Sequence, residues 1–114
     1  MAAPVAAYAA LGIAIAFEVV GTTFLGMSEQ FTKVVPTVLM GVCYVAAFYF
    51  LSLVLRTIPI GIAYAIWSGL GIVLITVIGY VRFRQALDPP AAIGVGLIIA
   101  GVVIANVFSG SAVH

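Results

Sequence analysis

Four long runs of apolar residues alternate with short polar segments along this chain. The runs extend over about residues 5–25, 35–55, 60–81 and 91–108. Each is roughly 18–22 residues long, and an α-helix of that length spans a hydrocarbon core of about 30 Å. The pattern therefore predicts an all-α membrane protein, in which residues 1–114 form a single domain of four transmembrane helices.

The prolines support these boundaries, because each stands near the start of an apolar run and none interrupts one. A helix tolerates proline in its first turn, where the missing N–H would have no partner inside the helix. Asp88 precedes the last run and suits a helix N-terminus, both as a cap and by its charge. The five prolines are Pro4, Pro36, Pro59, Pro89 and Pro90.

Composition then excludes several function classes. Hydrophobic residues make up 66% of the chain and charged residues only 6%, whereas roughly a quarter of a soluble domain is charged. With four Lys and Arg side chains in all, the chain offers no basic patch, so we expect no nucleic-acid partner. The single Cys43 cannot form an internal disulfide, and the single histidine is His114. We expect no enzyme activity, no cofactor and no bound metal.

The remaining charges gather in the connections between the runs. The first and third connections hold Lys33, Arg82 and Arg84, and the second holds Arg56. Four helices place both termini on the side of the second connection. The excess of Lys and Arg favours a cytoplasmic location for the first and third connections, by a small margin.

Glu18 is the one charged residue inside a predicted helix. It lies about 10 Å of helix rise from Leu25 and about 20 Å from Val5, within the hydrocarbon region. Intramembrane carboxylates are costly and usually mark paths for ions, protons or substrates, since a carboxyl group can exchange a proton for a cation. The alternative is a structural carboxyl group that keeps its proton and bonds to a neighbouring helix. The residues that share its helix face are small or mostly apolar and would leave space beside it: Leu11, Ala14, Ile15, Gly21 and Thr22.

Two aromatic sets have the spacing to meet Glu18. Tyr44 and Phe48 are spaced i, i+4 on the second helix, and Tyr64 and Trp67 are spaced i, i+3 on the third. Tyr44 and Trp67 lie about 10–12 Å past their prolines, deeper than most interfacial aromatic residues. Aromatic rings beside a carboxylate favour a bulky organic cation, through cation–π attraction and charge neutralisation. Plain packing is the alternative interpretation.

Small residues mark two further helix positions. Gly69 and Gly71 interrupt the third helix near its middle, where the chain could bend or pack closely. Helix faces made of small residues let helices approach each other closely in lipid. Four short helices are also too few to enclose a large ligand, so we expect a dimer. The fourth helix presents the candidate dimer contact, which consists of Gly94, Leu97, Ile98 and Gly101.

Together these features resemble the small multidrug resistance family of proton-coupled exporters, in its quaternary ammonium compound branch. The resemblance covers about residues 5–114 and is carried by residues 16–23 (AFEVVGTT), 58–73 (IPIGIAYAIWSGLGIV) and 94–102. It implies an antiporter of the bacterial inner membrane that exports lipophilic or quaternary ammonium cations in exchange for protons. It also implies an antiparallel dimer, in which the two subunits insert in opposite orientations.

The resemblance further implies roles for individual residues. Glu18 would bind the proton and the drug in turn, and Gly69 and Gly71 would bend the third helix. The face of the fourth helix described above would form the dimer contact. Phe48, chosen for its spacing from Tyr44, completes the candidate substrate-binding set. The positions that the resemblance itself implies for substrate are Tyr8, Leu11, Ala14, Ile15, Gly21, Thr22, Tyr44, Tyr64, Trp67 and Ser68.

Three positions depart from the family pattern. Gly26 stands where a lysine is common, Gly110 stands where a basic residue is often found, and Arg84 adds a charge. These departures increase the charge difference between the two sides of the membrane. The expected partner is therefore either a second copy in an antiparallel homodimer or a paired homologue with the opposite bias.

Two other functions remain as alternatives to drug export. A guanidinium exporter of the same family would share the fold and Glu18, although the many aromatic residues favour hydrophobic cations. A non-transporting membrane assembly subunit would not need a lone carboxylate within reach of two aromatic sets. The expected partners of the leading hypothesis are hydrophobic organic cations, protons and the lipid bilayer.

Overall fold

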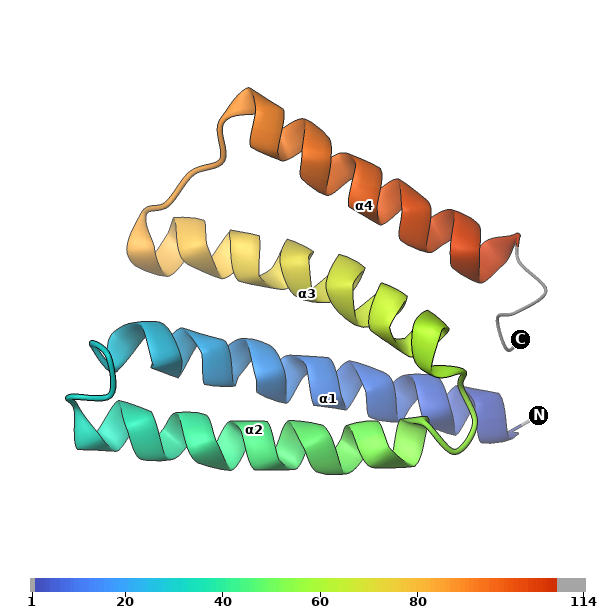
Figure 1. Cartoon of the computed structure of the whole chain (residues 1–114), viewed down its shortest axis with the longest axis horizontal. Helices are drawn as coiled ribbons and strands as arrows, with labels where there is room; N and C mark the ends of the chain where they lie inside the picture. Colours follow the sequence, from blue (N-terminus) through green and yellow to red (C-terminus); the bar gives the residue numbers. More distant parts are fainter. Residues whose placement is uncertain (1, 109–114) are drawn as a thin grey trace.

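The computed structural model describes residues 2–108, with side chains from Val5 onward, and this part of the chain consists of four α-helices (Figure 1). They are α1 (Ala2–Met27), α2 (Val34–Val54), α3 (Ile60–Phe83) and α4 (Pro89–Val107). Within the described range there is no strand, and all four helices are long and apolar enough to span a membrane. The prediction of an all-α protein with four membrane-spanning helices is confirmed. Gly110 and His114 lie outside the described residues.

The start of α4 shows how the sequence sets a helix boundary. Asp88 has an extended backbone conformation, and its side chain accepts a hydrogen bond from the N–H of Ala91 at 3.0 Å. Pro89 and Pro90 occupy the first two helical positions, where no N–H is needed. Asp88 therefore caps α4, as the sequence predicts.

The helices form a broad, shallow arrangement rather than a closed bundle (Figure 1). Their order across the molecule is α2, α1, α3 and α4, and the main contacts join these neighbours. The Cα atoms extend over 45 × 35 × 17 Å, so the molecule is about twice as wide as it is deep. Much of both broad faces is therefore open to lipid or to a second chain.

The hydrophobic core lies where α1 meets the end of α2 and the start of α3. In this region α1 contributes a stripe of small and branched residues, and the other helices contribute their last or first turns. The described part of α4 contributes no fully buried side chain. The core residues are Ala7, Leu11, Ile15, Val19, Val54, Ile58, Ile62 and Ala63.

A tight turn joins α1 to α2, and these two helices pack side by side. Glu29, Gln30 and Phe31 all adopt left-handed backbone conformations, with φ of 49°, 62° and 65°. Such conformations cost a non-glycine residue roughly 1–2 kcal/mol. The buried Ser28 holds the turn, because its hydroxyl donates to the carbonyl of Leu25 at 2.8 Å and accepts from the N–H of Phe31 at 3.2 Å.

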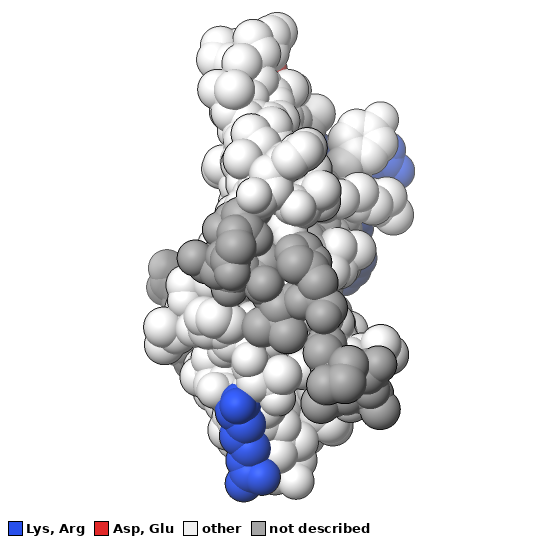
Figure 2. Space-filling model, turned by 90° about the vertical axis from the view of Figure 1, so that its right-hand side faces the viewer, with Lys and Arg blue, Asp and Glu red and all other residues white. Residues whose placement is uncertain are grey.

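Apart from Glu18, the charged side chains lie at the two ends of the molecule. Figure 2 looks at the end that carries the termini, where the described surface is mostly uncharged and shows little blue. Arg56 is exposed on the connection at this end. Lys33, Arg82 and Arg84 belong to the opposite end, where Lys33 pairs with Glu29 at 2.7 Å. This distribution suits helices whose ends reach the two surfaces of a bilayer.

Candidate functional site

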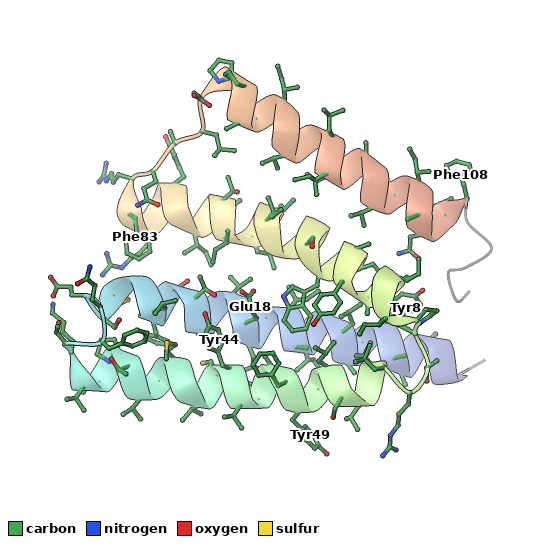
Figure 3. The ribbon with its side chains drawn as sticks, viewed as in Figure 1. Tyr8, Glu18, Tyr44, Tyr49, Phe83 and Phe108 are labelled. Carbon is green, nitrogen blue, oxygen red and sulfur yellow. The ribbon has the colours of Figure 1, made fainter. Side chains whose placement is uncertain are left out.

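Glu18 lies near the middle of α1, half-buried, at one end of a short chain of hydrogen bonds. The hydroxyl of Thr22 donates to Glu18 Oε1 at 2.9 Å and lies 2.7 Å from the hydroxyl oxygen of Tyr44. Because the Thr22 proton is directed to the carboxylate, the Tyr44 hydroxyl is the donor in the second bond. Figure 3 shows Glu18 on α1 and Tyr44 on α2 close to each other.

Two features of the α1 sequence build this chain. Thr22 follows Glu18 by one helical turn, so their side chains share a face. Gly21 leaves room for the Tyr44 ring, since a Cβ atom at this position would lie 2.8 Å from two of the ring carbons. Any larger residue at position 21 would push the Tyr44 hydroxyl away from Thr22.

A cavity of about 260 Å³ opens beside Glu18 between α1, α2 and α3. We call it the aromatic cavity. The side chains that α2 contributes to it all lie on one face of that helix. The two that α3 contributes, Tyr64 and Trp67, are three positions apart, which is less than one helical turn. Tyr64 and Phe48 are exposed at its edge, whereas Tyr44 and Trp67 are half-buried. Its lining consists of Glu18, Tyr44, Ala47, Phe48, Leu51, Tyr64 and Trp67.

A second cavity, of about 250 Å³, lies on the other side of Glu18 against α3. Glu18 and Trp67 line both cavities, so the carboxylate stands between them. Gly71 keeps this space open, because a Cβ atom there would lie 3.9 Å from Glu18 Oε2 and 3.7 Å from Trp67 Cδ1. The full lining is Glu18, Thr22, Trp67, Ser68, Gly71, Ile72 and Ile75.

Glu18 has no basic partner within the part of the chain that the structure describes. The ion pair found there joins Lys33 to Glu29 at the surface. The ionised carboxylate would therefore receive the hydrogen bond of Thr22, and no residue that lines its two cavities carries a positive charge. Such a site lacks a counter-charge, which a cation or a proton can supply.

Some of the residues expected at a substrate site lie elsewhere in this structure. Tyr8 donates a hydrogen bond to Asn106 Oδ1 of α4 at 3.4 Å and lines neither cavity. Leu11, Ala14 and Ile15 are buried, with exposed fractions of 1%, 0% and 0%, and they also line neither cavity. Their assignment to substrate binding stays a prediction.

Two of the glycines in α3, Gly69 and Gly71, have a visible packing role. A Cβ atom at Gly69 would lie 2.7 Å from Val102 Cγ2, so this glycine lets α4 approach α3 closely. Gly71 faces Glu18, as described above, and α3 stays helical through both positions. A bend of α3 at these glycines remains a prediction.

The expected dimer face of α4 is unoccupied within this chain. A Cβ atom at Gly94 or Gly101 would meet nothing within 4 Å, and Leu97 and Ile98 are 69% and 42% exposed. The geometry leaves this face available to another molecule in the membrane. Its use as a dimer contact stays a prediction.

Sequence reasoning missed some of the residues that line the two cavities. Ala47 lies between Tyr44 and Leu51 on one face of α2, and the aromatic spacing could have identified it. Ile72 and Ile75 continue the face of α3 that carries Ser68 and Gly71. Their side chains carry no polar group, so only their helical spacing from Ser68 and Gly71 could have identified them as cavity-lining residues.

Comparison with known proteins places the chain in a family. Residues 6–98 match the family model described as Small Multidrug Resistance protein. The multidrug transporter EmrE of Escherichia coli K12 is 52% identical over 107 residues, which cover 94% of this chain and 97% of the relative. The quaternary ammonium compound-resistance protein QacE of Escherichia coli is 50% identical over 104 residues, covering 91% and 94%. A multidrug transporter of Pseudomonas aeruginosa is 50% identical over 107 residues, covering 94% and 97%.

These relatives and the four membrane-spanning helices identify a multi-pass protein of a bacterial inner membrane. The match covers most of the four-helix region, including Glu18 and both sets of cavity-lining residues. The chain belongs to the Small Multidrug Resistance protein family.

Proposed function

We propose that this chain exports lipophilic and quaternary ammonium cations by exchanging them for protons at Glu18, and so gives resistance to drugs and antiseptics. The observation that carries the proposal is the aromatic cavity, in which a carboxylate with no basic partner among the described residues adjoins Tyr44, Tyr64 and Trp67. The names of the relatives, which refer to multidrug transport and quaternary ammonium resistance, support this substrate class. Membership of the family supports a transporter rather than an enzyme.

Two interactions would hold the cation in the aromatic cavity. The ionised Glu18 neutralises its charge, and the ring faces attract it through cation–π interaction, worth about 2 kcal/mol or more where water is excluded. Neither interaction requires a hydrogen bond in a fixed direction. The site therefore suits cations that share a charge and an apolar surface but differ in shape.

The same carboxylate would couple export to protons. Protonation of Glu18 removes the negative charge that holds the cation, so the proton and the cation compete for one group. Thr22 fixes Oε1, while Oε2 lies on the side of Gly71 and α3. Alternating exposure of this site to the two membrane surfaces would then complete an exchange cycle.

We also propose that the working unit is an antiparallel dimer, either of two copies or of this chain with a paired homologue. The molecule is 35 Å wide and only 17 Å deep, so one chain does not surround the cavities beside Glu18. A second chain across the broad face would enclose a bound cation and bring a second Glu18 to the same chamber. The unoccupied face of α4 would provide contact area at the edge.

Proton release on drug binding tests this function directly. Tetraphenylphosphonium is added to the purified protein in detergent and weak buffer, and the change in pH is recorded. We expect protons to be released on binding and the apparent affinity to increase with pH, because proton and cation compete. The Glu18→Gln variant is the matched control and should release none. Saturable binding near neutral pH without proton release from the parent protein would reject the exchange mechanism.

A further inference from the structure

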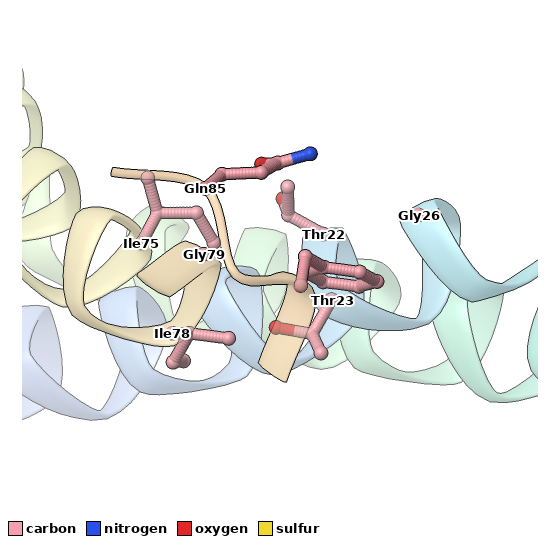
Figure 4. A pocket seen from close by; sticks show the side chains of 8 residues that line it. Thr22, Thr23, Gly26, Ile75, Ile78, Gly79 and Gln85 are labelled. Carbon is pink, nitrogen blue, oxygen red and sulfur yellow. The ribbon is translucent and has the colours of Figure 1, made fainter. Parts of the chain in front are cut away.

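A third cavity, of about 280 Å³, lies between α1 and α3 toward the end that carries Lys33, Arg82 and Arg84. We call it the vestibule. It shares Thr22 and Ile75 with the second cavity beside Glu18, so the two spaces adjoin each other. Figure 4 shows Thr22 and Thr23 from α1 facing Gln85 and the last turns of α3. The lining consists of Thr22, Thr23, Gly26, Ile75, Ile78, Gly79, Phe83 and Gln85.

The vestibule has polar groups at both of its ends. At the inner end is Thr22, whose hydroxyl is bonded to Glu18. At the outer end is the amide of Gln85, whose Oε1 would lie 3.6 Å from a Cβ atom at Gly79. A volume of this size with hydroxyl and amide groups in its wall has room and partners for several water molecules.

The end of α3 fixes the position of Gln85. Arg84 adopts the left-handed conformation (φ 59°), and its N–H donates to the carbonyl of Tyr80 at 3.1 Å. The N–H of Gln85 donates to the carbonyl of Gly79 at 2.9 Å, which turns the chain back over the last turn of the helix. The Gln85 side chain therefore lies beside the vestibule as a consequence of how α3 ends.

Phe83 closes part of the outer wall against α1. Its ring tip points at Gly26, since a Cβ atom at that position would lie 3.2 Å from Phe83 Cζ and 3.7 Å from the two adjacent ring carbons. The guanidinium carbon of Arg82 lies 5.4 Å from the ring centroid, within the range of cation–π attraction. Glycine at position 26 lets the ring lie this close, because a Cβ atom there would make a tight contact and the ring tip would have to move by a few tenths of an ångström.

We propose that the vestibule is the water-filled route between Glu18 and this end of the protein, and that the Phe83 ring resting on Gly26 is its gate. The inference rests on the proposed function, because a proton and a cation that compete for Glu18 need a path to water. The route runs from Glu18 past the Thr22 hydroxyl and along Thr23 to Gln85. When the ring lies on Gly26 the route is narrowed, and when the ring swings away it is open.

Cysteine labelling in proteoliposomes tests both parts of the proposal. In a Cys43→Ala background, Thr23→Cys places a thiol in the vestibule, and a membrane-impermeant sulfonatoethyl methanethiosulfonate reports whether water reaches it. We expect Thr23→Cys to be labelled and Phe83→Ala to accelerate the labelling by about an order of magnitude, since ring opening no longer limits access. Phe83→Leu, which keeps an apolar side chain, should give an intermediate rate.

Val38→Cys is the matched control, because it lies at a similar depth near the start of α2 but is 56% exposed on the outside of the chain. It should label slowly with or without Phe83. Labelling of Thr23→Cys as slow as that of Val38→Cys, even with Phe83→Ala, would show that the vestibule is dry. A Thr23→Cys rate that does not depend on Phe83 would show that the ring is no gate.

Proton release measured on the same variants separates this inference from the proposed function. Loss of gating with proton release intact overturns the vestibule proposal alone. Absence of proton release from the parent protein, with gated labelling intact, overturns the exchange mechanism alone. Each variant is first checked for insertion and for saturable tetraphenylphosphonium binding.

Discussion

Helices α1 and α4 are both apolar and long enough to cross a membrane, but they are used in opposite ways. In α1 a third of the membrane-spanning window, 33%, is buried inside the chain, whereas in α4 the share is 0%. Helix α1 packs against both α2 and α3 and carries Glu18, whereas the main contacts of α4 are with α3. Hydrophobic length thus indicates that a helix can span the membrane, whereas burial shows how far it packs within its own chain.

The largest expected effect comes from the chemistry of α1. Glu18→Gln should abolish proton-coupled export while leaving the protein folded and inserted, because glutamine keeps the size of the side chain but cannot exchange a proton. The measurement is uptake of a quaternary cation into proteoliposomes driven by a pH gradient. Glu18→Asp is the companion variant and should transport with a shifted pH profile. Gradient-driven uptake by Glu18→Gln at the parent rate would remove Glu18 from the mechanism.

A pair of leucines tests the packing difference directly. Leu11 of α1 is 1% exposed and Leu97 of α4 is 69% exposed. Leu11→Ala should lower the free energy of unfolding by about 2–4 kcal/mol, since it leaves a cavity in the core. Leu97→Ala should change the unfolding of the monomer by no more than about 0.5 kcal/mol. Unfolding in mixed micelles at low protein concentration gives both values, and equal losses would mean that α4 is packed as tightly as α1.

An effect smaller than that of Leu11→Ala is expected in α3, which contacts both of the helices compared above. Trp67→Ala should weaken the binding of an aromatic or quaternary cation by roughly 1–2 kcal/mol, about tenfold, because a cation–π face is lost. Equilibrium binding of tetraphenylphosphonium measures the affinity, and the yield of folded protein measures stability. A lower yield of folded protein with unchanged affinity would show that Trp67 contributes to packing and not to cation binding. Its role would then resemble that of Gly69.

The amino-acid sequence predicts the helices of this fold but not all of the contacts between them. Apolar runs and prolines predict four helices, and the capping role of Asp88 follows from its place before Pro89. Helical spacing within α2 and within α3 predicts the aromatic sets that the structure brings to Glu18. These features depend on residues close together in the chain, so local periodicity reveals them.

Contacts between distant segments could not be obtained in this way. Periodicity places Leu11 and Ile15 on the face of Glu18 but does not say that α2 and α3 cover them. It does not show that Tyr8 meets Asn106 of α4, 98 positions away in the chain. The vestibule was missed for the same reason, since Gly26 and Phe83 meet only after α1 and α3 are packed together.

The scarcity of polar groups in the aromatic cavity bears on which cations the protein can select. Apart from Glu18, that cavity offers the polar atoms of Tyr44, Tyr64 and Trp67, and the rest of its lining is hydrocarbon. A cation that enters leaves its hydration shell and regains few hydrogen bonds. Ions whose charge is covered by alkyl or aryl groups lose little hydration, whereas guanidinium and primary ammonium ions lose a great deal. We therefore expect the cavity to favour cations whose water is removed at a low free-energy cost, with tetraphenylphosphonium far ahead of guanidinium.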